Sequence, residues 1–238
     1  MSSHGGGDPM DFAWFEAPPR DRLEAALDLL RLLGSADDRA ITPLGATLRR
    51  YPLSPRVACV LVAAGGSARA AAACALVSER DAFRGDVSHV ATDSDVLSRV
   101  DRLREAPAGV RDMARKLHAI ARREFGEGDA RDDDGSILRA LLAGYPDRVA
   151  RRREPGSPRM LLASGTGAVL SRDSGVREAE WIVAIDLVAG PRGPGSEAIV
   201  SVASAIERDW LEPTSRDVVH HFDEEAGVVR AIARDHYL

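Results

Sequence analysis

The sequence predicts an α+β fold, with helices in the first part of the chain and a small β-domain in the second. Up to about residue 144, apolar side chains recur at steps of three and four residues, which is the spacing of one helix face. Beyond residue 159, short apolar runs alternate with turns rich in Gly, Ser and Pro, which is typical of short strands. Hydrophobic residues make up 45% of the 238 residues, enough to fill packed cores.

The chain opens with a polar leader and an aromatic run. Residues 1–9 are small and polar, which predicts a flexible leader that lacks the basic and apolar regions of a signal peptide. Phe12, Trp14 and Phe15 then form a short strand-like run that a proline pair ends. We expect these rings to lie in a core rather than to stack on bases.

A helix, a small hairpin and a second helix are predicted next. Leucines repeat on one face of residues 20–33, and Asp21 is a candidate capping residue. Residues 35–42 are a polar turn with one or two short strands. Thr42 as cap and Pro43 at the first helical position then predict a second helix. Together these elements make up most of a winged-helix unit.

Further helical stretches predict a compact bundle over residues 55–125. They lie at residues 55–64, 67–78, 94–106 and 108–125. The second stretch is rich in alanine, so its neighbours are able to approach closely. Cys59 and Cys74 both lie in apolar helical context, which predicts buried, reduced thiols in a cytoplasmic protein and no metal site.

An acidic linker is predicted between the helices and the β-domain. It covers residues 126–135, and we expect its Asp132, Asp133 and Asp134 to be solvated. After a short helix at 136–144, strand-like runs lie at 160–162, 168–170, 181–185 and 199–202, with a helical turn at 206–211 and a β-like stretch at 217–238. These short strands are typical of a small β-barrel or sandwich.

The motifs of several enzyme classes are absent. The sequence has no GxxxxGK[ST] phosphate loop and no DEAH-like acidic box. Gly165-Thr166-Gly167 lies between two strand-like runs and predicts a β-turn rather than a phosphate loop. His220 and His221 are neighbours on a predicted strand and point to opposite faces, so they are poor joint metal ligands. We therefore predict no catalytic, cofactor-binding or metal-binding residues, and no membrane span.

The charge pattern contains one basic segment. Because the formal net charge is -5, any nucleic-acid surface must be a local patch. Segment 136–159 holds six arginines against two acidic residues, and barrels that bind single strands use such a positive groove. The alternative is that residues 151–153 form a solvated charge run or pair with the acidic linker, and the residues alone favour neither. Trp181, in the middle of a predicted strand, is expected in the core.

Several motifs resemble the region that follows the motor domains in HrpB-like ATP-dependent helicases of the DEAH type. Between Phe12 and Leu61, the similar segments are Leu29-Leu30, Leu32-Leu33-Gly34, Ile41 to Gly45 and Tyr51 to Arg56. VSERD at 77–81, GYPDRVARRR at 144–153 and EWIVAIDL at 180–187 extend the resemblance to nearly the whole chain. Thr166 is a departure, because the family often has an arginine there.

The resemblance implies a domain order and a function. The implied domains are a partial winged helix over 10–53, a ratchet-like helical bundle over 54–125, an OB-like β-domain over 136–213 and the start of a C-terminal extension over 214–238. They would bind single-stranded RNA or DNA and couple to RecA-like motor domains, which hold ATP and magnesium in that family. Because the motor motifs are absent here, we expect no ATP hydrolysis by this chain alone.

The resemblance and the charge pattern together predict six nucleic-acid-binding arginines. They are Arg56 and Arg80 in the matched helical motifs and Arg148, Arg151, Arg152 and Arg153 at the start of the β-domain. Two alternatives remain open. One is a stand-alone winged-helix or scaffold protein that binds a protein partner, which the acidic net charge slightly favours. The other is a helicase remnant without function.

Overall fold

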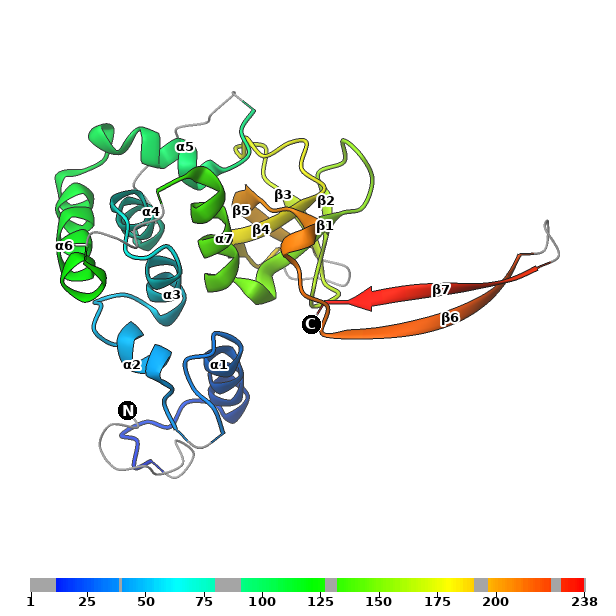
Figure 1. The fold of residues 1–238 in the computed structure, drawn as a ribbon, viewed down its shortest axis with the longest axis horizontal. Coiled ribbons are helices and arrows are strands. Elements are labelled where there is room, and N and C mark those ends of the chain that lie inside the picture. The colour runs from blue at the N-terminus through cyan, green and yellow to red at the C-terminus, as the bar shows by residue number, and fades with distance from the viewer. Residues whose placement is uncertain are drawn as a thin grey trace.

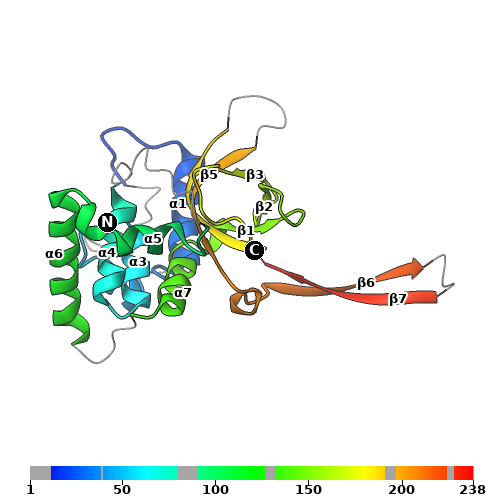
Figure 2. The same ribbon diagram turned by 90° about the horizontal axis from the view of Figure 1, so that it is seen from above.

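The computed structural model describes residues 12–38, 40–79, 91–126, 132–190, 197–223 and 228–237. Helices form one half of the body, a five-stranded barrel lies beside them, and a two-stranded ribbon extends away from the barrel (Figures 1 and 2). This arrangement confirms the predicted α+β fold and the order of helices before strands.

The helices lie where the apolar periodicity placed them. The α-helices of the described residues are α1 (Arg20–Leu32), α2 (Pro43–Leu48), α3 (Pro55–Ala63), α4 (Ala68–Ser78), α5 (Asp95–Asp101), α6 (Ala108–Phe125) and α7 (Asp134–Gly144). The Thr42 hydroxyl caps α2 as predicted, accepting a hydrogen bond of 3.1 Å from the Gly45 amide. The predicted capping role of Asp21 is wrong, because α1 begins at Arg20 and Asp21 lies inside its first turn.

Small residues allow the helices of the bundle to pack closely. In α4, every residue from Ala70 to Leu76 is buried, so this alanine-rich helix is surrounded by its neighbours. Helix α7 packs against α3, and a Cβ added to Gly144 would lie 2.5 Å from a Val60 methyl carbon and 2.6 Å from the Arg56 carbonyl oxygen. Only glycine fits at this crossing without displacement of one helix.

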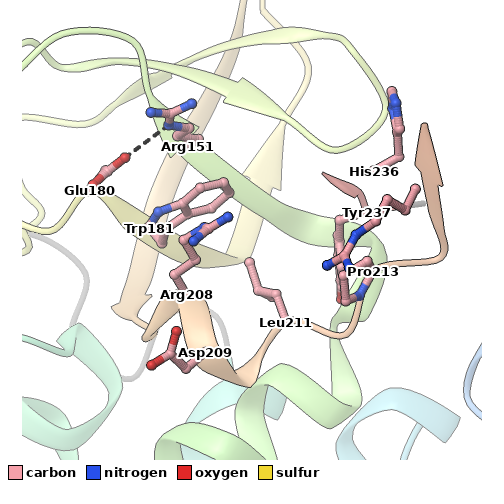
Figure 3. Close-up of a pocket in the computed structure, with 10 residues that line it drawn as sticks. Arg151, Glu180, Trp181, Arg208, Asp209, Leu211, Pro213, His236 and Tyr237 are labelled. Carbon is pink, nitrogen blue, oxygen red and sulfur yellow. Dashed lines mark hydrogen bonds and ion pairs between the residues drawn. The ribbon is translucent and has the colours of Figure 1, made fainter. Parts of the chain in front are cut away.

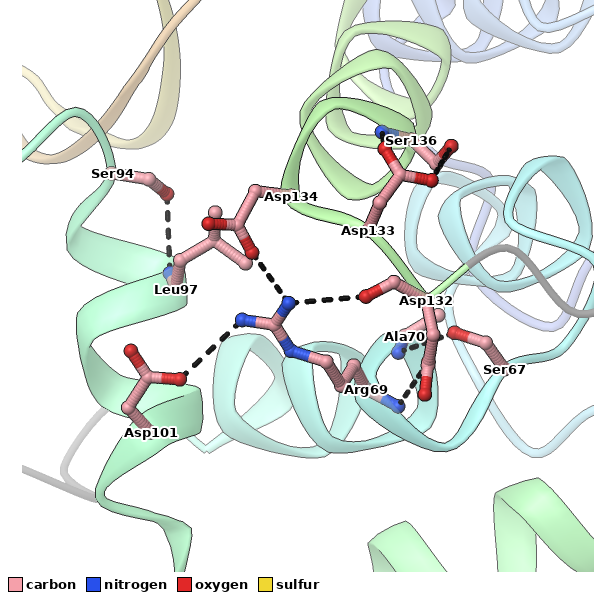
Figure 4. Close-up of polar contacts among 10 residues, drawn as sticks. All are labelled: Ser67, Arg69, Ala70, Ser94, Leu97, Asp101, Asp132, Asp133, Asp134 and Ser136. Carbon is pink, nitrogen blue, oxygen red and sulfur yellow. Dashed lines mark hydrogen bonds and ion pairs between the residues drawn. The ribbon is translucent and has the colours of Figure 1, made fainter.

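An arginine joins three of these helices. The Arg69 guanidinium at the start of α4 contacts Asp101 at the end of α5, the Asp132 carbonyl and the Asp134 carboxylate of α7 (Figure 4). Asp133 caps α7 by accepting from the Ser136 amide at 2.8 Å. Asp132, Asp133 and Asp134 are all exposed, as predicted, and they also cap one helix and hold another.

The N-terminal part packs much less. Helix α1 contains no buried residue, although Leu33 directly after it is buried. The expected strand and core position of the aromatic run are also wrong: Phe12 is 52% exposed and Phe15 is fully exposed. No partner strand covers these two rings among the described residues, and Phe12 instead lies edge-on to Trp14, with ring centroids 5.0 Å apart.

The β-domain is a closed barrel. Its strands are β1 (Val149–Arg152), β2 (Arg159–Leu162), β3 (Gly167–Leu170), β4 (Trp181–Val188) and β5 (Ala198–Ala205), in the order β1-β2-β3-β5-β4. Strands β3 and β5 are parallel, and the other pairs are antiparallel. Closure selects the barrel from the two predicted alternatives. Gly165, at φ 77°, makes the predicted turn between β2 and β3.

A buried carboxylate joins the barrel to the helices. Asp95, at the start of α5, accepts hydrogen bonds from the Ser174 hydroxyl at 2.7 Å, the Gly175 amide at 2.8 Å and the Ala203 amide at 2.9 Å. Beside it, the hydroxyl oxygens of Ser94 and Ser204 lie 2.7 Å apart. We call this group of hydrogen bonds around Asp95 the joint. Since buried carboxylates are stable only when fully hydrogen-bonded, the joint fixes α5 on the barrel.

The chain continues into a ribbon. A short 3-10 helix (Arg208–Trp210) at the predicted helical turn leads to β6 (Ser215–Asp223), which pairs antiparallel with β7 (Val228–His236) in the predicted β-like stretch. Pairing runs from Ser215 opposite His236 to Asp223 opposite Val228. The side chains of His220 and His221 are outside the described part of the structure.

Candidate nucleic-acid interface

The basic segment contains a strand, although a solvated charge run at residues 151–153 was one of the two alternatives left open by the sequence. Residues 149–152 form β1, paired with β2 on one side and β4 on the other. Because successive side chains of a strand point to opposite faces, Arg151 lies outside the barrel and Arg152 inside it. Neighbouring arginines of one motif therefore have different surroundings.

Arg152 is bound within the fold. It is only 6% exposed, and its guanidinium donates to the carbonyl oxygens of Ala179 at 2.9 Å, Val176 at 3.5 Å and Ser157. Burial lowers its pKa from the usual arginine value. These carbonyls come from the β1–β2 and β3–β4 connections, so Arg152 holds both connections to β1.

Arg56 and Arg148 flank one buried aromatic ring. Both guanidinium carbons lie 5.4 Å from the ring centroid of Tyr145. Arg56 makes a bidentate pair with Asp147, at 2.6 and 2.7 Å, and Arg148 donates to the Ile185 carbonyl at 2.9 Å. Burial tends to raise the pKa of Asp147, but the hydrogen bonds and charge of Arg56 hold it below the usual value. Burial lowers the pKa of Arg148.

The remaining predicted arginines differ in exposure. Arg151 is 60% exposed, donates to Glu180 at 2.9 Å, and lies over the Trp181 ring at 5.3 Å from the centroid. Arg153 and Arg159, at the two ends of the β1–β2 connection, are partly exposed and lie 4.0 and 3.7 Å from Glu197. Arg80 lies outside the described residues.

An open groove begins at Arg151. It has a volume of about 530 Å³ and is lined by Arg151, Glu180, Trp181, Arg208, Asp209, Leu211, Pro213, Arg216, His236 and Tyr237. Figure 3 shows Arg151 and Arg208 on either side of the Trp181 ring, with Tyr237 on the opposite wall. The walls come from β1, β4, the connection after β5 and the end of the ribbon nearest the barrel, where β6 begins and β7 ends.

The groove combines positive charge with aromatic rings. Three arginines stand against two carboxylates, those of Glu180 and Asp209. Trp181 begins β4 and is half-buried, so its ring packs against the core while it also lines the groove, which partly confirms its expected core position. Guanidinium groups bind phosphate and rings stack on bases, so the groove has the chemistry to hold an unpaired strand.

Most of this groove was not predicted from the sequence. Arg208, Arg216 and Tyr237 belong to segments that the sequence pattern did not connect with the basic region. A signal was present in the segment ERDWLEPTSR at 207–216, where two arginines stand close to an aromatic residue. What the sequence could not supply is the path of the ribbon, which brings Tyr237 back to the barrel, where its hydroxyl donates to the Pro146 carbonyl at 3.0 Å.

The described ranges hold neither a metal-binding cluster nor a membrane-spanning helix. There, no group of three or more His, Cys, Asp or Glu side chains is arranged to hold a metal ion. None of the helices in the described ranges combines the length and apolar character that crossing a membrane requires.

Comparison with known proteins identifies one relative clearly. No protein-family model matches the sequence. The ATP-dependent RNA helicase HrpB of Escherichia coli (strain K12) is 30% identical over an alignment of 238 residues, which covers 97% of this chain and 27% of that protein. The chain therefore spans about a quarter of the length of its curated relative.

Solved structures show the same fold. The crystal structure of the E. coli DExH-box NTPase HrpB matches 95% of this chain and 27% of its own, with a TM-score of 0.72 and 24% identity. A crystal structure of the E. coli DEAH/RHA helicase HrpB matches 98% of this chain and 28% of its own, with a TM-score of 0.75 and 22% identity. The resemblance to HrpB-like helicases is confirmed.

Proposed function

We propose that this chain, similar over nearly its whole length to a region of HrpB, is an accessory region of an ATP-dependent helicase that binds single-stranded RNA or DNA. The groove beside Trp181 carries the proposal. It joins exposed guanidinium groups, an aromatic ring and an open shape in one place on an acidic protein. Such a combination binds a strand through its phosphates and its bases without requiring a particular sequence.

The register of the barrel supports this assignment. Arg151 lies directly opposite Trp181 in the pairing of β1 with β4, so a cation and a ring share one edge of the groove. A phosphate that reaches Arg151 would bring its neighbouring base within reach of the indole. Stacking of one base on an aromatic side chain contributes roughly 1–3 kcal/mol to binding.

The barrel itself supports an OB-like assignment. OB-folds are five-stranded barrels whose second and third strands, with the connections after strands one and four, bind oligonucleotides. Arg153 and Arg159 lie at the β1–β2 connection, next to the exposed Leu161 of β2. This outer face would extend the path of a strand beyond the groove.

Helix α1 supports coupling to RecA-like motor domains. Leu23, Leu27 and Leu30 share one face and are only partly buried. A surface helix normally buries such an apolar stripe, so this face fits a protein partner. Replacing Leu23 and Leu27 by Asn should leave the free energy of unfolding almost unchanged and weaken association with the separately purified RecA-like domains of E. coli HrpB in sedimentation. Unchanged association would exclude this face.

The test of strand binding is fluorescence anisotropy of a labelled single-stranded RNA at low and moderate salt, without ATP. Affinity should fall with salt, and the variant Arg151→Ala/Arg208→Ala should bind more weakly with a slope of log K against log salt that is shallower by about 1.4, or 0.7 for each phosphate contact. The matched control is Arg115→Ala/Arg123→Ala, which removes two exposed arginines from α6. Equal slopes in both variants, or no binding at low salt, would contradict the proposal.

A further inference from the structure

A second cavity lies at the end of the barrel where the β1–β2 and β3–β4 connections meet. Its volume is about 420 Å³, and it is separate from the groove because the two share no lining residue. Three arginines line it, namely Arg152, Arg172 and Arg177, together with Ser171, Ser174 and Glu178. The two cavities therefore lie on opposite sides of β1, one beside Arg151 and the other beside Arg152.

Arg152 brings a nearly buried positive charge to this cavity. A guanidinium has five N–H donors, and the hydrogen bonds of Arg152 go to three carbonyl oxygens. In the described parts of the chain, no carboxylate lies within ion-pair distance of it. The hydrogen bonds of Arg152 therefore go to carbonyl oxygens, and the Glu178 carboxylate, which lines the same cavity, is near enough to act on its charge.

The other two cations are exposed. Arg172 and Arg177 both belong to the β3–β4 connection, and neither forms an ion pair with another described residue. Glu178 is the single carboxylate among the residues that line the cavity, so the lining is positive by two charges.

The hydroxyl groups of the cavity are already in use. The Ser174 hydroxyl donates to the Asp95 carboxylate at 2.7 Å, and the Ser171 hydroxyl donates to the Asp173 carboxylate at 3.3 Å. A ligand would therefore be held mainly by guanidinium groups. Their planar N–H forks match the oxygen spacing of a phosphate group.

We propose that this cavity binds a phosphate group. The phosphate is either a free phosphate anion or a phosphodiester of the nucleic-acid backbone, and only the second source rests on the function proposed above. Arg151 and Arg152 are consecutive residues of β1 that point to opposite faces, so a strand that fills the groove would bring a backbone phosphate to the cavity by passing around the end of β1. The cavity would then add a charge contact to the stacking contacts of the groove.

The experiment compares the wild type with Arg172→Ala/Arg177→Ala, and Arg115→Ala/Arg123→Ala is again the control. All four positions are exposed, so unfolding curves should coincide. The first probe is inorganic phosphate, observed by the line width of its ³¹P resonance as protein is added. The second is single-stranded RNA, observed by anisotropy across a salt series. We expect the cavity variant to abolish the phosphate broadening and to make the salt slope shallower by about 0.7.

The outcomes separate the two sources. Loss of broadening with an unchanged RNA slope assigns the cavity to free phosphate, and a shallower slope without broadening by phosphate assigns it to the backbone. If the wild type binds no RNA, the strand-binding proposal fails while the phosphate measurement still decides the cavity. The inference would be overturned if the Arg172→Ala/Arg177→Ala variant matched the wild type both in its broadening of the phosphate resonance and in its salt slope for RNA, or if the wild type showed no phosphate broadening and the two proteins had the same salt slope.

Discussion

Arginines in two regions of this molecule have opposite roles. Arg56 and Arg148, between the helices and the barrel, and Arg152, inside the end of the barrel, are largely covered and donate to carboxylates or carbonyls of the chain itself. In the groove, Arg151 and Arg208 are exposed next to Trp181. The residue type is the same, and only its position on a strand or connection differs. A count of arginines therefore does not locate a nucleic-acid surface, whereas the face that each side chain occupies does.

The largest effect is expected at the joint. Asp95→Ala would leave the buried amides of Gly175 and Ala203 without acceptors, each at a cost of about 1–3 kcal/mol. The free energy of unfolding in urea should fall by roughly 3–5 kcal/mol in total. Asp95→Asn, which keeps one acceptor oxygen, should lose less. A loss below about 1 kcal/mol in the alanine variant would show that the attachment of the helices to the barrel does not depend on the hydrogen bonds of Asp95.

A smaller effect is expected where Arg56 meets Asp147. Arg56→Met removes the partner of a carboxylate that is partly covered, so we expect a loss of about 1–3 kcal/mol in the free energy of unfolding near neutral pH. Arg56→Lys should recover only part of it, because lysine lacks the bidentate fork.

The pH dependence checks the cause of that loss. Because the pKa of Asp147 is lowered in the folded state, the stabilisation by Arg56 is complete above the unfolded pKa of about 4 and disappears as the pH falls through the folded pKa. The difference in unfolding free energy between wild type and Arg56→Met should therefore shrink below about pH 4. A difference that stays constant down to pH 2 would point to lost packing instead.

The buried thiols of Cys59 and Cys74 test how tightly the helical bundle is packed. Burial raises the pKa of Cys59 to about 11, so its thiol stays protonated in the folded chain when the unfolded thiol has already ionised. The free energy of unfolding should therefore decline as the pH rises from about 9 towards 11. At pH 8, a thiol reagent should modify Cys59 and Cys74 only after urea is added. Rapid modification of the native protein would show that the bundle opens far more readily than its packing implies.

The sequence predicted the helices more completely than the site. Helices 20–33, 55–64 and 108–125 were evident because their apolar residues repeat over several turns. Strand β1 was hidden, since charged residues at 151–153 obscure the period-two alternation that reveals a strand. The exposure of α1 was also hidden, because periodicity shows that a face is apolar but not what covers it.

The groove depended on long-range structure. Trp181 and Arg151 are brought together by strand register, and Tyr237 joins them only because β6 and β7 form a hairpin that returns to the barrel. The individual residues were visible in the sequence, but their distances were not. The role of Arg152 shows the same limit, because its partners are carbonyl groups of two distant connections.

The most direct test of this account compares Arg151→Ala with Arg152→Ala, two neighbouring substitutions of the same chemistry. RNA affinity and the free energy of unfolding would be measured for both. We expect Arg151→Ala to weaken RNA binding and reduce the salt slope by about 0.7, with a change in unfolding free energy below about 1 kcal/mol. Arg152→Ala should instead lower the unfolding free energy by roughly 2–4 kcal/mol, because it leaves three buried or partly buried carbonyl oxygens without their donor. An Arg151→Ala variant with wild-type affinity and salt slope would contradict the assignment of the groove.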